Sequence, residues 1–571
     1  MSATASKTSH YPTEKNKVLH DFKASNNFYE SDQILQHYVR HKVSAQGMAY
    51  MQDNLQYIGK AAAGPMNELS LDADKNGPVL VKRNAFGETV NEIKFHPSYW
   101  ELMKIAVKSG MFRVKWEPSL QAQFKHEGHR LGFAAGYLYA MSESGQYCPL
   151  CMTDGVARLI DLFCDDEDKA RLLPHIYTED AEQFYTGAMY LTEKTGGSDV
   201  GASITTATHK EGNTYLLNGE KWFCSNANAE IIFALARTDS EVKGTRGLSI
   251  FMVEKNLPDG TRNPIDVIRL KDKLGVRSMA SSETYLTDTQ GTLVGEEFQG
   301  FKVMIEMVNL SRLYNSVAAL SCSRRALIET YQFLNARKTF GKTAMEHALI
   351  RTKLTELGAL NVANFYLVWR AIEALDNTDA GNEREAQLFR IINPMTKKWS
   401  AEKGVYIVRE SMELMGGLGY IEDQVMPKLM RDIMVLPIWE GSGNIIILDM
   451  LRALWKSNGL TVLLEEIANS ATNSPENAEF LHNGISELVA FGESLKDLPQ
   501  DEMEASAKVF FEKLTSLYQI SLLIDNLDKE SDAWISPALT YLKTAYSPST
   551  KLQQVRPLNV ETVNGLIAWN I

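Results

Sequence analysis

The chain is poor in cysteine and has no long hydrophobic run. Its 571 residues include 5 cysteines, an odd number that argues against a disulfide framework and favours a reducing compartment. The polar start, Met1 to Lys7, lacks the apolar run of a signal peptide, and no stretch approaches the length of a membrane span. We therefore expect a cytoplasmic protein with no transmembrane segment. A mitochondrial matrix location stays open, because the start is rich in Ser, Thr and Lys.

Positive charge is also scarce. The formal net charge is −12 at pH 7, and from Leu460 onward 7 Lys or Arg stand against 16 Asp or Glu. Binding to a phosphate backbone needs a clustered basic surface. We therefore expect no nucleic-acid partner.

The common phosphate and metal motifs are absent as well. The segment Thr192 to Val200 has paired glycines that permit a tight turn able to cradle a phosphate. It has neither the P-loop Lys-Ser pair nor the G-x-G-x-x-G spacing. Cys148 and Cys151 form a single C-x-x-C without a second pair, so a structural role is favoured and no metal site is expected. His126 and His129, three residues apart in a charged helical stretch, are interpreted as a solvated face.

Hydrophobic spacing divides the chain into helical, strand-rich and helical regions. The periodicity is helical from about Asp32 to Asp180, with a polar interruption near Leu69 to Asn91. From Gln183 to about Gly295, short apolar runs alternate with Gly, Asn and Asp turns, which predicts a small barrel or sandwich. Helical patterning resumes at Gly300 and continues through the C-terminal segment.

The expected fold class is therefore mainly α with a β domain (α+β). Pro394 and Pro437 are expected to break helices in the third region. One helical stripe of the C-terminal segment is interpreted as core, and it comprises Phe510, Phe511, Leu514, Leu517 and Tyr518. The expected units are an N-terminal helical domain, a middle β domain, a helical bundle and a helical extension, over residues 1–182, 183–298, 299–456 and 457–571.

A lone carboxylate, Glu440, is the candidate general base. It lies in Pro437 to Asn444, between a helix-breaking proline and a glycine-rich turn that opens the apolar helix Ile445 to Leu454. The apolar neighbours Ile438 and Trp439 are expected to desolvate the carboxylate, which raises its pKa and makes it more basic. The positive end of the following helix would favour the anion, and also an oxyanion on a bound thioester or ketone. The alternative is an ordinary solvated turn glutamate.

Further blocks accompany this one in a fixed order. Asn218 to Asn226 has a hairpin-like Asn-Gly turn before an aromatic strand. Arg337 to Lys342 clusters cations beside Phe340 and suits a pyrophosphate contact. Together with Thr192 to Val200, Pro437 to Asn444, Met415 to Tyr420 and Met430 to Asp432, they resemble the FAD-dependent acyl-CoA dehydrogenase family. The similarity is greatest to its long branch with an extra C-terminal helical domain, which includes the alkylation-induced adaptive-response flavoproteins. It covers almost the whole chain and fades after about residue 457.

The resemblance implies a fold, a cofactor and a reaction. The fold would have a helical N-terminal domain, a β-barrel or sandwich, a four-helix bundle and the extra helical domain. Glu440 would remove a proton from the acyl α carbon of an acyl-CoA while a hydride leaves the β carbon for flavin N5, giving a trans-2-enoyl-CoA. Thr192 would lie near N5, and Phe223 and Ser225 would flank the ring.

The resemblance also assigns binding residues. Those expected to contact FAD are Met189, Tyr190, Leu191, Thr192, Gly197, Ser198, Phe223, Ser225, Arg337, Thr339, Phe340, Glu413, Gly416, Gly417, Ser442 and Asn444. Those expected near acyl-CoA are Ser198, Asn309, Arg312 and Gly441. Because Arg337, Thr339 and Phe340 would reach the FAD of a neighbouring subunit, a homodimer or homotetramer is implied. The implied electron acceptor is an electron-transfer flavoprotein.

Several positions depart from the family pattern. Asn309 stands where shorter-chain members carry an aspartate, Phe223 replaces a tryptophan and Ser225 a threonine. Glu413 replaces a glutamine, and a carboxylate there would repel an anionic dinucleotide unless an arginine intervenes. Some members place their base on the helix near Arg312, but Val308 to Arg312 holds no carboxylate, which leaves Glu440.

Three functions fit these residues. The first is an acyl-CoA dehydrogenase of fatty-acid metabolism acting on a medium or long chain. The second is a flavoprotein that binds acyl-CoA with little turnover, as a sensor or sequestering protein. The third is an adaptive-response protein associated with DNA, against which the acidic extension argues.

Overall fold

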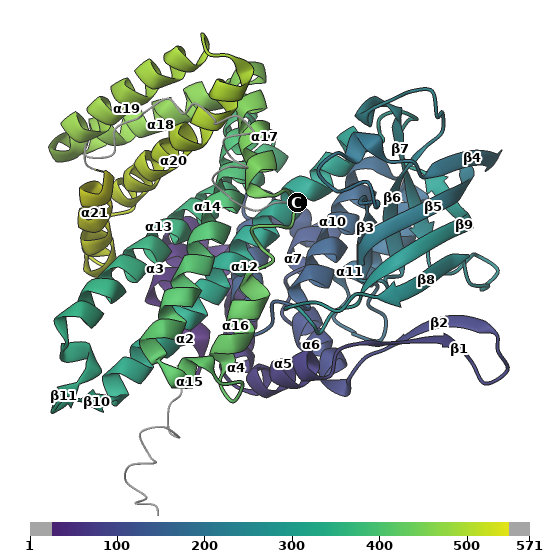
Figure 1. Ribbon diagram of the computed structural model, residues 1–571, viewed down its shortest axis with the longest axis horizontal. Helices are drawn as coiled ribbons and strands as arrows, with labels where there is room; N and C mark the ends of the chain where they lie inside the picture. Colours follow the sequence, from purple (N-terminus) through teal and green to yellow (C-terminus); the bar gives the residue numbers. More distant parts are fainter. Residues whose placement is uncertain (1–25, 547–571) are drawn as a thin grey trace, which may run out of the picture.

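The computed structural model describes residues 26–546, and its N-terminal part is helical (Figure 1). Side-chain caps and prolines set where these helices begin. Ser44 accepts from the Gly47 N–H at 2.9 Å, Asp165 accepts from the Asp168 N–H at 2.9 Å, and three helices have proline in the first turn. The helices are α2 (Phe28–Ser31), α3 (Gln33–Lys42), α4 (Ala45–Ala63), α5 (Pro65–Lys75), α6 (Pro97–Lys108), α7 (Arg113–Trp116), α8 (Pro118–Gln123), α9 (Gly128–Ala140), α10 (Tyr147–Phe163) and α11 (Asp166–Tyr177).

The polar interruption holds a β-hairpin that the periodicity did not predict. Helix α5 runs on to Lys75, and then β1 (Val79–Arg83) pairs antiparallel with β2 (Thr89–Lys94). Both strands are half-exposed or exposed along their length, so they lack the apolar alternation that marks a strand. Figure 1 shows the hairpin lying beside β8, below the β domain.

The middle region is a closed β structure, as the alternating apolar runs predicted. The strands are β3 (Gly187–Tyr190), β4 (Thr206–Glu211), β5 (Thr214–Ser225), β6 (Ile231–Arg237), β7 (Leu248–Glu254), β8 (Ile265–Leu270) and β9 (Ser281–Leu293). Their order is β3-β6-β4-β5-β9-β7, with β8 on β9, and a further β6–β7 pairing closes the ring. Side chains that alternate inward form a core of their own, including Tyr190, Leu217, Phe251 and Leu286. The other face of β3 and β6 packs on the helical core.

Three long helices build the bundle, α12 (Gly300–Ala336), α13 (Ala348–Asp379) and α14 (Glu383–Met415). The short strands β10 (Lys338–Thr339) and β11 (Lys342–Thr343) turn the chain between α12 and α13. The shorter helices α15 (Gly417–Tyr420), α16 (Val425–Ile433) and α17 (Gly443–Lys456) follow α14. The expected break at Pro394 is wrong, because α14 continues through it while packed against α12 and α13. Pro437 does lie between helices, as expected.

The described part of the C-terminal extension, residues 457–546, is helical and packs on the bundle (Figure 1). It comprises α18 (Gly459–Asn473), α19 (Pro475–Leu495), α20 (Gln500–Asp525) and α21 (Asp532–Tyr546). The predicted stripe is core, because each of its five side chains is at most 2% exposed. Arg370 of α13 bonds both Glu385 of α14 and Glu466 of α18 at 2.8 Å, which ties the extension to the bundle.

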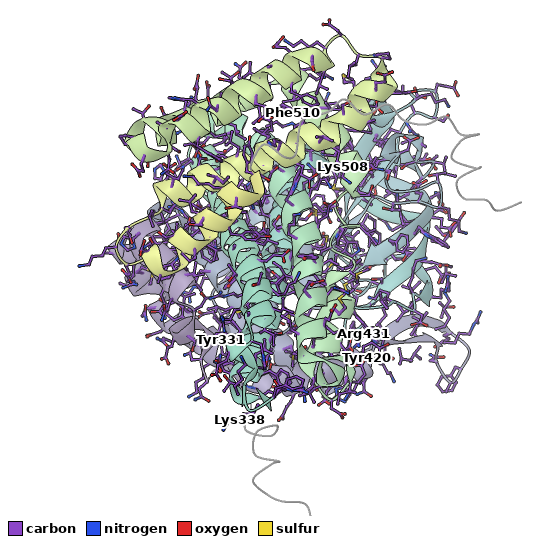
Figure 2. The ribbon with its side chains drawn as sticks, turned by 60° about the vertical axis from the view of Figure 1, so that its left-hand side comes forward. Tyr331, Lys338, Tyr420, Arg431, Lys508 and Phe510 are labelled. Carbon is purple, nitrogen blue, oxygen red and sulfur yellow. The ribbon has the colours of Figure 1, made fainter. Side chains whose placement is uncertain are left out.

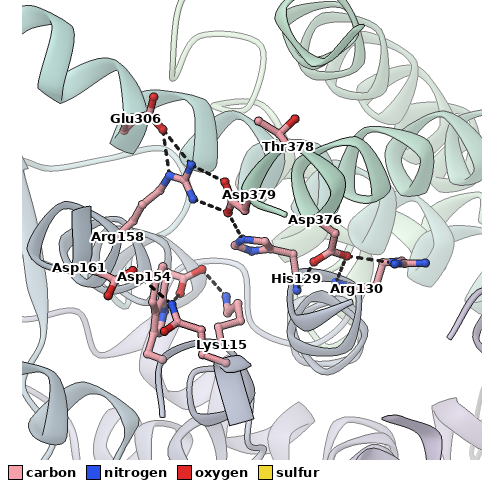
Figure 3. A network of polar contacts seen from close by, with 12 residues as sticks. Lys115, His129, Arg130, Asp154, Arg158, Asp161, Glu306, Asp376, Thr378 and Asp379 are labelled. Atoms are coloured by element: carbon pink, nitrogen blue, oxygen red, sulfur yellow. Dashed lines mark hydrogen bonds and ion pairs between the residues drawn. The ribbon is translucent and has the colours of Figure 1, made fainter. Parts of the chain in front are cut away.

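The interpretation of His129 as part of a solvated face is wrong, although His126 is exposed. Helix α9 is central, and His129 Nε2 lies 2.9 Å from Asp379 of α13, which also pairs with Arg158 at 2.7 Å (Figure 3). Burial acts to raise the pKa of Asp379, but the bonds from His129 and Arg158 hold it below the usual range. Spacing along one helix carries no information about such partners.

All five cysteines lie within the described residues and are free. No helix between residues 26 and 546 combines the length and the apolarity that a membrane crossing requires.

Candidate active site

Glu440 lies in the turn between α16 and α17, as the sequence predicted. The turn forces a left-handed backbone, with φ of 57° at Glu440 and 104° at Gly441. A non-glycine residue in this region costs free energy and persists only where its surroundings hold it. Helix α17 begins at Gly443 with Ser442 as N-cap, and the Ser442 side chain makes no capping bond. The first N–H groups of α17 are therefore available beside the carboxylate.

Two buried cations hold this turn through its carbonyls. Lys397 of α14 donates from Nζ to the Gly441 carbonyl at 2.6 Å and to the Pro437 carbonyl at 3.3 Å. Arg312 of α12 donates from Nε to the Glu440 carbonyl at 3.4 Å and pairs with Asp449 at 2.8 Å. The Arg312 guanidinium, expected on the acyl-CoA side, is thus bonded to protein. No signal in the sequence pointed to Lys397, because polar residues such as Asn393 and Ser400 share its helix face.

Burial and the neighbouring polar groups shift the pKa of Glu440 in opposite directions. Burial raises the pKa of Glu440, while the Ser311 hydroxyl, Lys397 and Arg312 lower it. Burial lowers the pKa of Lys397 to about 7, and Glu440 counteracts that shift. A half-buried carboxylate beside cations remains available as an anion yet is more basic than one in water.

Helix α10 and the β domain face the same carboxylate. The charge of Glu440 raises the pKa of both the Cys148 and the Cys151 thiol, while Ser225 at the end of β5 lowers that of Cys148. Burial raises the pKa of Cys148 to about 12, so the thiol is neutral. Glu440 therefore lies where the N-terminal helices, the β domain and the bundle meet.

The β domain offers an open aromatic surface and a tight turn next to it. Phe223 is 58% exposed, and the Trp222 N–H donates to the Thr192 carbonyl at 2.9 Å, which fixes β5 beside the Thr192 turn. A Cβ on Gly197 would come within 2.9 Å of Thr192 Oγ1, so glycine is needed for this close approach. The turn is anchored by the buried pair of Glu193 and Lys221 at 2.8 Å. Lys271 Nζ lies 4.6 Å from the centroid of the Phe223 ring, and this exposed ring beside a glycine turn fits a flavin.

Side chains of the predicted segment Met189 to Thr192 point alternately to the two faces of the strand. Tyr190 is 1% exposed inside the barrel, so only its backbone could contact a cofactor. Met189 and Leu191 are half-buried on the opposite face, toward the helical core. Ser198 is exposed on the turn, and Asn309 is half-buried with its carbonyl accepting from Asn393 at 3.0 Å.

Asn444 is the second residue of α17, next to the Glu440 turn, whereas the predicted residues on the β10–β11 turn and at the end of α14 lie at the far end of the bundle. Lys397 and Glu413 are 16 positions apart on the continuous α14, which corresponds to about 24 Å at 1.5 Å per residue. Gly416 and Gly417 follow Glu413, and Phe340 on the β10–β11 turn is 98% exposed. Figure 2 shows Tyr331, Lys338 and Tyr420 at this same end. These residues do not join Glu440 within one chain.

An arginine next to Glu413 counters the repulsion expected between this carboxylate and an anionic dinucleotide. Arg409, one helical turn earlier, pairs with Glu413 at 2.7 Å, and both side chains are more than half exposed. The arginine that the sequence argument required is therefore present.

Known proteins share this arrangement. Residues 20–181 match the adaptive response protein AidB N-terminal domain, residues 188–289 the acyl-CoA dehydrogenase middle domain, and residues 299–455 the acyl-CoA dehydrogenase C-terminal domain. The AidB protein of Escherichia coli (strain K12) is 32% identical over 457 residues, which span 77% of this chain and 80% of that protein. The chain belongs to the acyl-CoA dehydrogenase family.

Two further comparisons agree with this assignment to the acyl-CoA dehydrogenase family. Acyl-CoA dehydrogenase family member 11 of Caenorhabditis elegans is 30% identical over 436 residues, 75% of this chain and 70% of that protein. The crystal structure of C. elegans ACDH-11 in complex with C11-CoA has a TM-score of 0.86 at 25% identity, covering 97% of this chain and 95% of that one. Family members are FAD-dependent flavoproteins, so FAD is the cofactor. The predicted fold class and family are confirmed.

Proposed function

We propose that this protein is an acyl-CoA dehydrogenase that converts a medium- or long-chain acyl-CoA to the trans-2-enoyl-CoA, with Glu440 as the general base. The main support is the environment of Glu440. Its backbone is held in a left-handed conformation by Lys397 and Arg312, and burial raises its pKa. A solvated turn glutamate would need neither feature. A more basic carboxylate is suited to taking a proton from the carbon next to a thioester.

Each part of the turn has a task in this reaction. The Glu440 carboxylate takes the proton from the acyl α carbon, and the electrons of that C–H bond form the double bond. FAD, when bound, accepts the hydride from the β carbon. The Glu440 N–H and the free N–H groups of α17 stabilise negative charge that develops on the thioester oxygen. Gly441 leaves room for this approach because it carries no side chain.

The proposal also covers the acyl-chain length and the assembly of the protein. The C. elegans relative was solved with C11-CoA, which supports a medium or long acyl chain here. The exposed Arg337 and Phe340 support a homodimer or homotetramer in which this end of the bundle reaches a neighbour's FAD. An electron-transfer flavoprotein would reoxidise the flavin. Five free cysteines support a reducing compartment such as the cytoplasm.

Anaerobic titration with acyl-CoAs of increasing length tests the proposal. Rapid bleaching of the oxidised-flavin band by one length class supports a dehydrogenase, and Glu440→Gln should retain flavin but abolish bleaching. Glu465→Gln, at an exposed pair on α18, is the matched control and should bleach normally. A band that shifts without bleaching in the native protein would favour the acyl-CoA sensor instead. Normal bleaching in Glu440→Gln would exclude Glu440 as the base.

A further inference from the structure

A histidine and carboxylate group joins the C-terminal extension to α3. His37 and His41 are four residues apart on one face of α3, and Asp528 comes from the loop between α20 and α21. One candidate ligand atom from each lies within 4.8 Å of the other two. Between residues 26 and 546, no other three His, Cys, Asp or Glu side chains gather in this way. None of the three belongs to the site around Glu440.

The hydrogen bond of His41 leaves one ring nitrogen ready for a ligand. His41 Nδ1 lies 2.8 Å from the His37 carbonyl, and because a carbonyl can only accept, Nδ1 carries the proton. Nε2 of the neutral ring therefore has a free lone pair. Metal-binding histidines commonly donate their second nitrogen to a carbonyl or carboxylate in this way. The His41 side chain is exposed, which leaves a path for an ion to enter.

His37 is buried but incompletely satisfied. It is 4% exposed, its Nε2 lies 2.9 Å from Asp528 Oδ2, and its Nδ1 has no hydrogen-bond partner. Whichever nitrogen carries the proton, protein groups satisfy only one of the two, and an unsatisfied buried polar atom is costly. The rings of His41 at 4.2 Å and Trp534 at 5.5 Å fix its plane.

Asp528 is oriented toward His37 before any ion binds. Its Oδ1 accepts from the Glu530 N–H at 2.9 Å, the Ser531 N–H at 2.8 Å and the Ser531 hydroxyl at 2.9 Å. Oδ2 is left facing His37. The nearby cation Arg40 pairs with Glu530, so its charge is already compensated.

We propose that His37, His41 and Asp528 form a binding site for a divalent late transition-metal ion such as Zn²⁺, which fixes the loop between α20 and α21 to α3. Two neutral imidazoles and one carboxylate suit Zn²⁺ or Ni²⁺, whereas Mg²⁺ and Ca²⁺ prefer oxygen ligands. Ligand atoms about 2.0–2.1 Å from a tetrahedral ion lie roughly 3.4 Å apart. The candidate atoms, now within 4.8 Å of one another, would move to this spacing on binding, and water would complete the coordination.

The test uses the full-length flavin-loaded protein after dialysis against a chelator. Calorimetric titration with Zn²⁺ should show one site per chain, and hydrogen exchange should show Zn²⁺-dependent protection of the loop from residue 526 to 532. His41→Gln and Asp528→Asn should each weaken binding at least tenfold. The asparagine keeps the Oδ1 acceptor of the turn, so this variant should fold. His482→Gln, at an exposed histidine of α19, is the control and should bind normally.

Two results would overturn the site. One is the lack of saturable Zn²⁺ binding in the native protein. The other is one-to-one binding that both His41→Gln and Asp528→Asn retain at native affinity, because the ion would then sit elsewhere.

Discussion

Replacing Lys397 with methionine removes the ammonium that holds the turn of the proposed catalytic base, Glu440, while keeping the side chain's length. The lost contacts are the bonds to the Gly441 and Pro437 carbonyls at 2.6 and 3.3 Å. A hydrogen bond to a charged group contributes about 1.5–3 kcal/mol. If the shorter bond is fully expressed in the barrier, flavin reduction below about pH 7, where Lys397 carries its charge, should slow by about 10- to 150-fold, at about 1.4 kcal/mol per factor of ten.

The same variant should change the pH dependence. The pKa of Lys397 is lowered by burial to about 7, so below that pH its ammonium opposes the burial that raises the pKa of Glu440. Without the ammonium, the pKa of Glu440 rises further. Because Glu440 must be deprotonated to act as the base, the fall in reduction rate at low pH should begin at a higher pH than in the native protein. Well above pH 7, the rate should be reduced only because the turn is held less firmly.

Anaerobic stopped-flow reduction across a range of pH measures both effects. Lys403→Met, on the same helix and half-exposed, is the control and should behave like the native protein. Flavin content should stay normal in both variants, which separates the effect from loss of cofactor. If Lys397→Met reduces at the native rate with an unchanged acid limb, the argument that this lysine positions the base is refuted.

Two other substitutions and one pH effect follow from the structure. Gly197→Val should force the Thr192 side chain to rotate. An overpacking cost of about 1–3 kcal/mol should weaken flavin retention, measured by flavin absorbance, by about 5- to 150-fold. Gly358→Ala, with no atom near its added methyl, is the control and should keep its flavin. Phe340→Asp should shift the assembly toward the monomer in analytical ultracentrifugation, and an unchanged mass would remove this residue from the proposed interface. The pKa of Asp379 is lowered in the folded state, so the carboxylate stabilises the fold above its unfolded pKa of about 3.9, and this contribution is lost as the pH falls further. In Asp379→Asn, the melting temperature should therefore fall less steeply with decreasing pH on the acid side. An unaltered slope would contradict this.

The sequence predicted the features that depend on local chemistry. Apolar runs broken by turn residues identified the β domain, and the stripe through Phe511 and Leu514 identified a buried helix face. The turn that holds Glu440 was predictable because proline and glycine flank it in the chain. These signals lie within a few residues of the feature they predict.

The features that the sequence missed depend on distant partners. Lys397 lies 43 positions before Glu440 in the printed chain, and only the packing of α14 brings its ammonium to the turn. His129 is buried because α9 packs against α13, and Asp379 of α13 bonds its ring. Pro394 is tolerated because neighbouring helices hold α14 on either side. The β1–β2 hairpin has too little alternation of apolar and polar residues to be predicted from the sequence.

That hairpin bears on how the protein behaves at high concentration. Strands β4 to β7 and β9 close on themselves, but β8 pairs only with β9 and presents its other side. On that side Lys82 donates to the Val267 carbonyl at 2.8 Å and Asn91 to the Ile265 carbonyl at 3.2 Å. A bare strand edge can recruit a strand from another molecule. Here side-chain donors already occupy the carbonyls that such a strand would use, so the edge is protected against aggregation without adding a strand to the sheet.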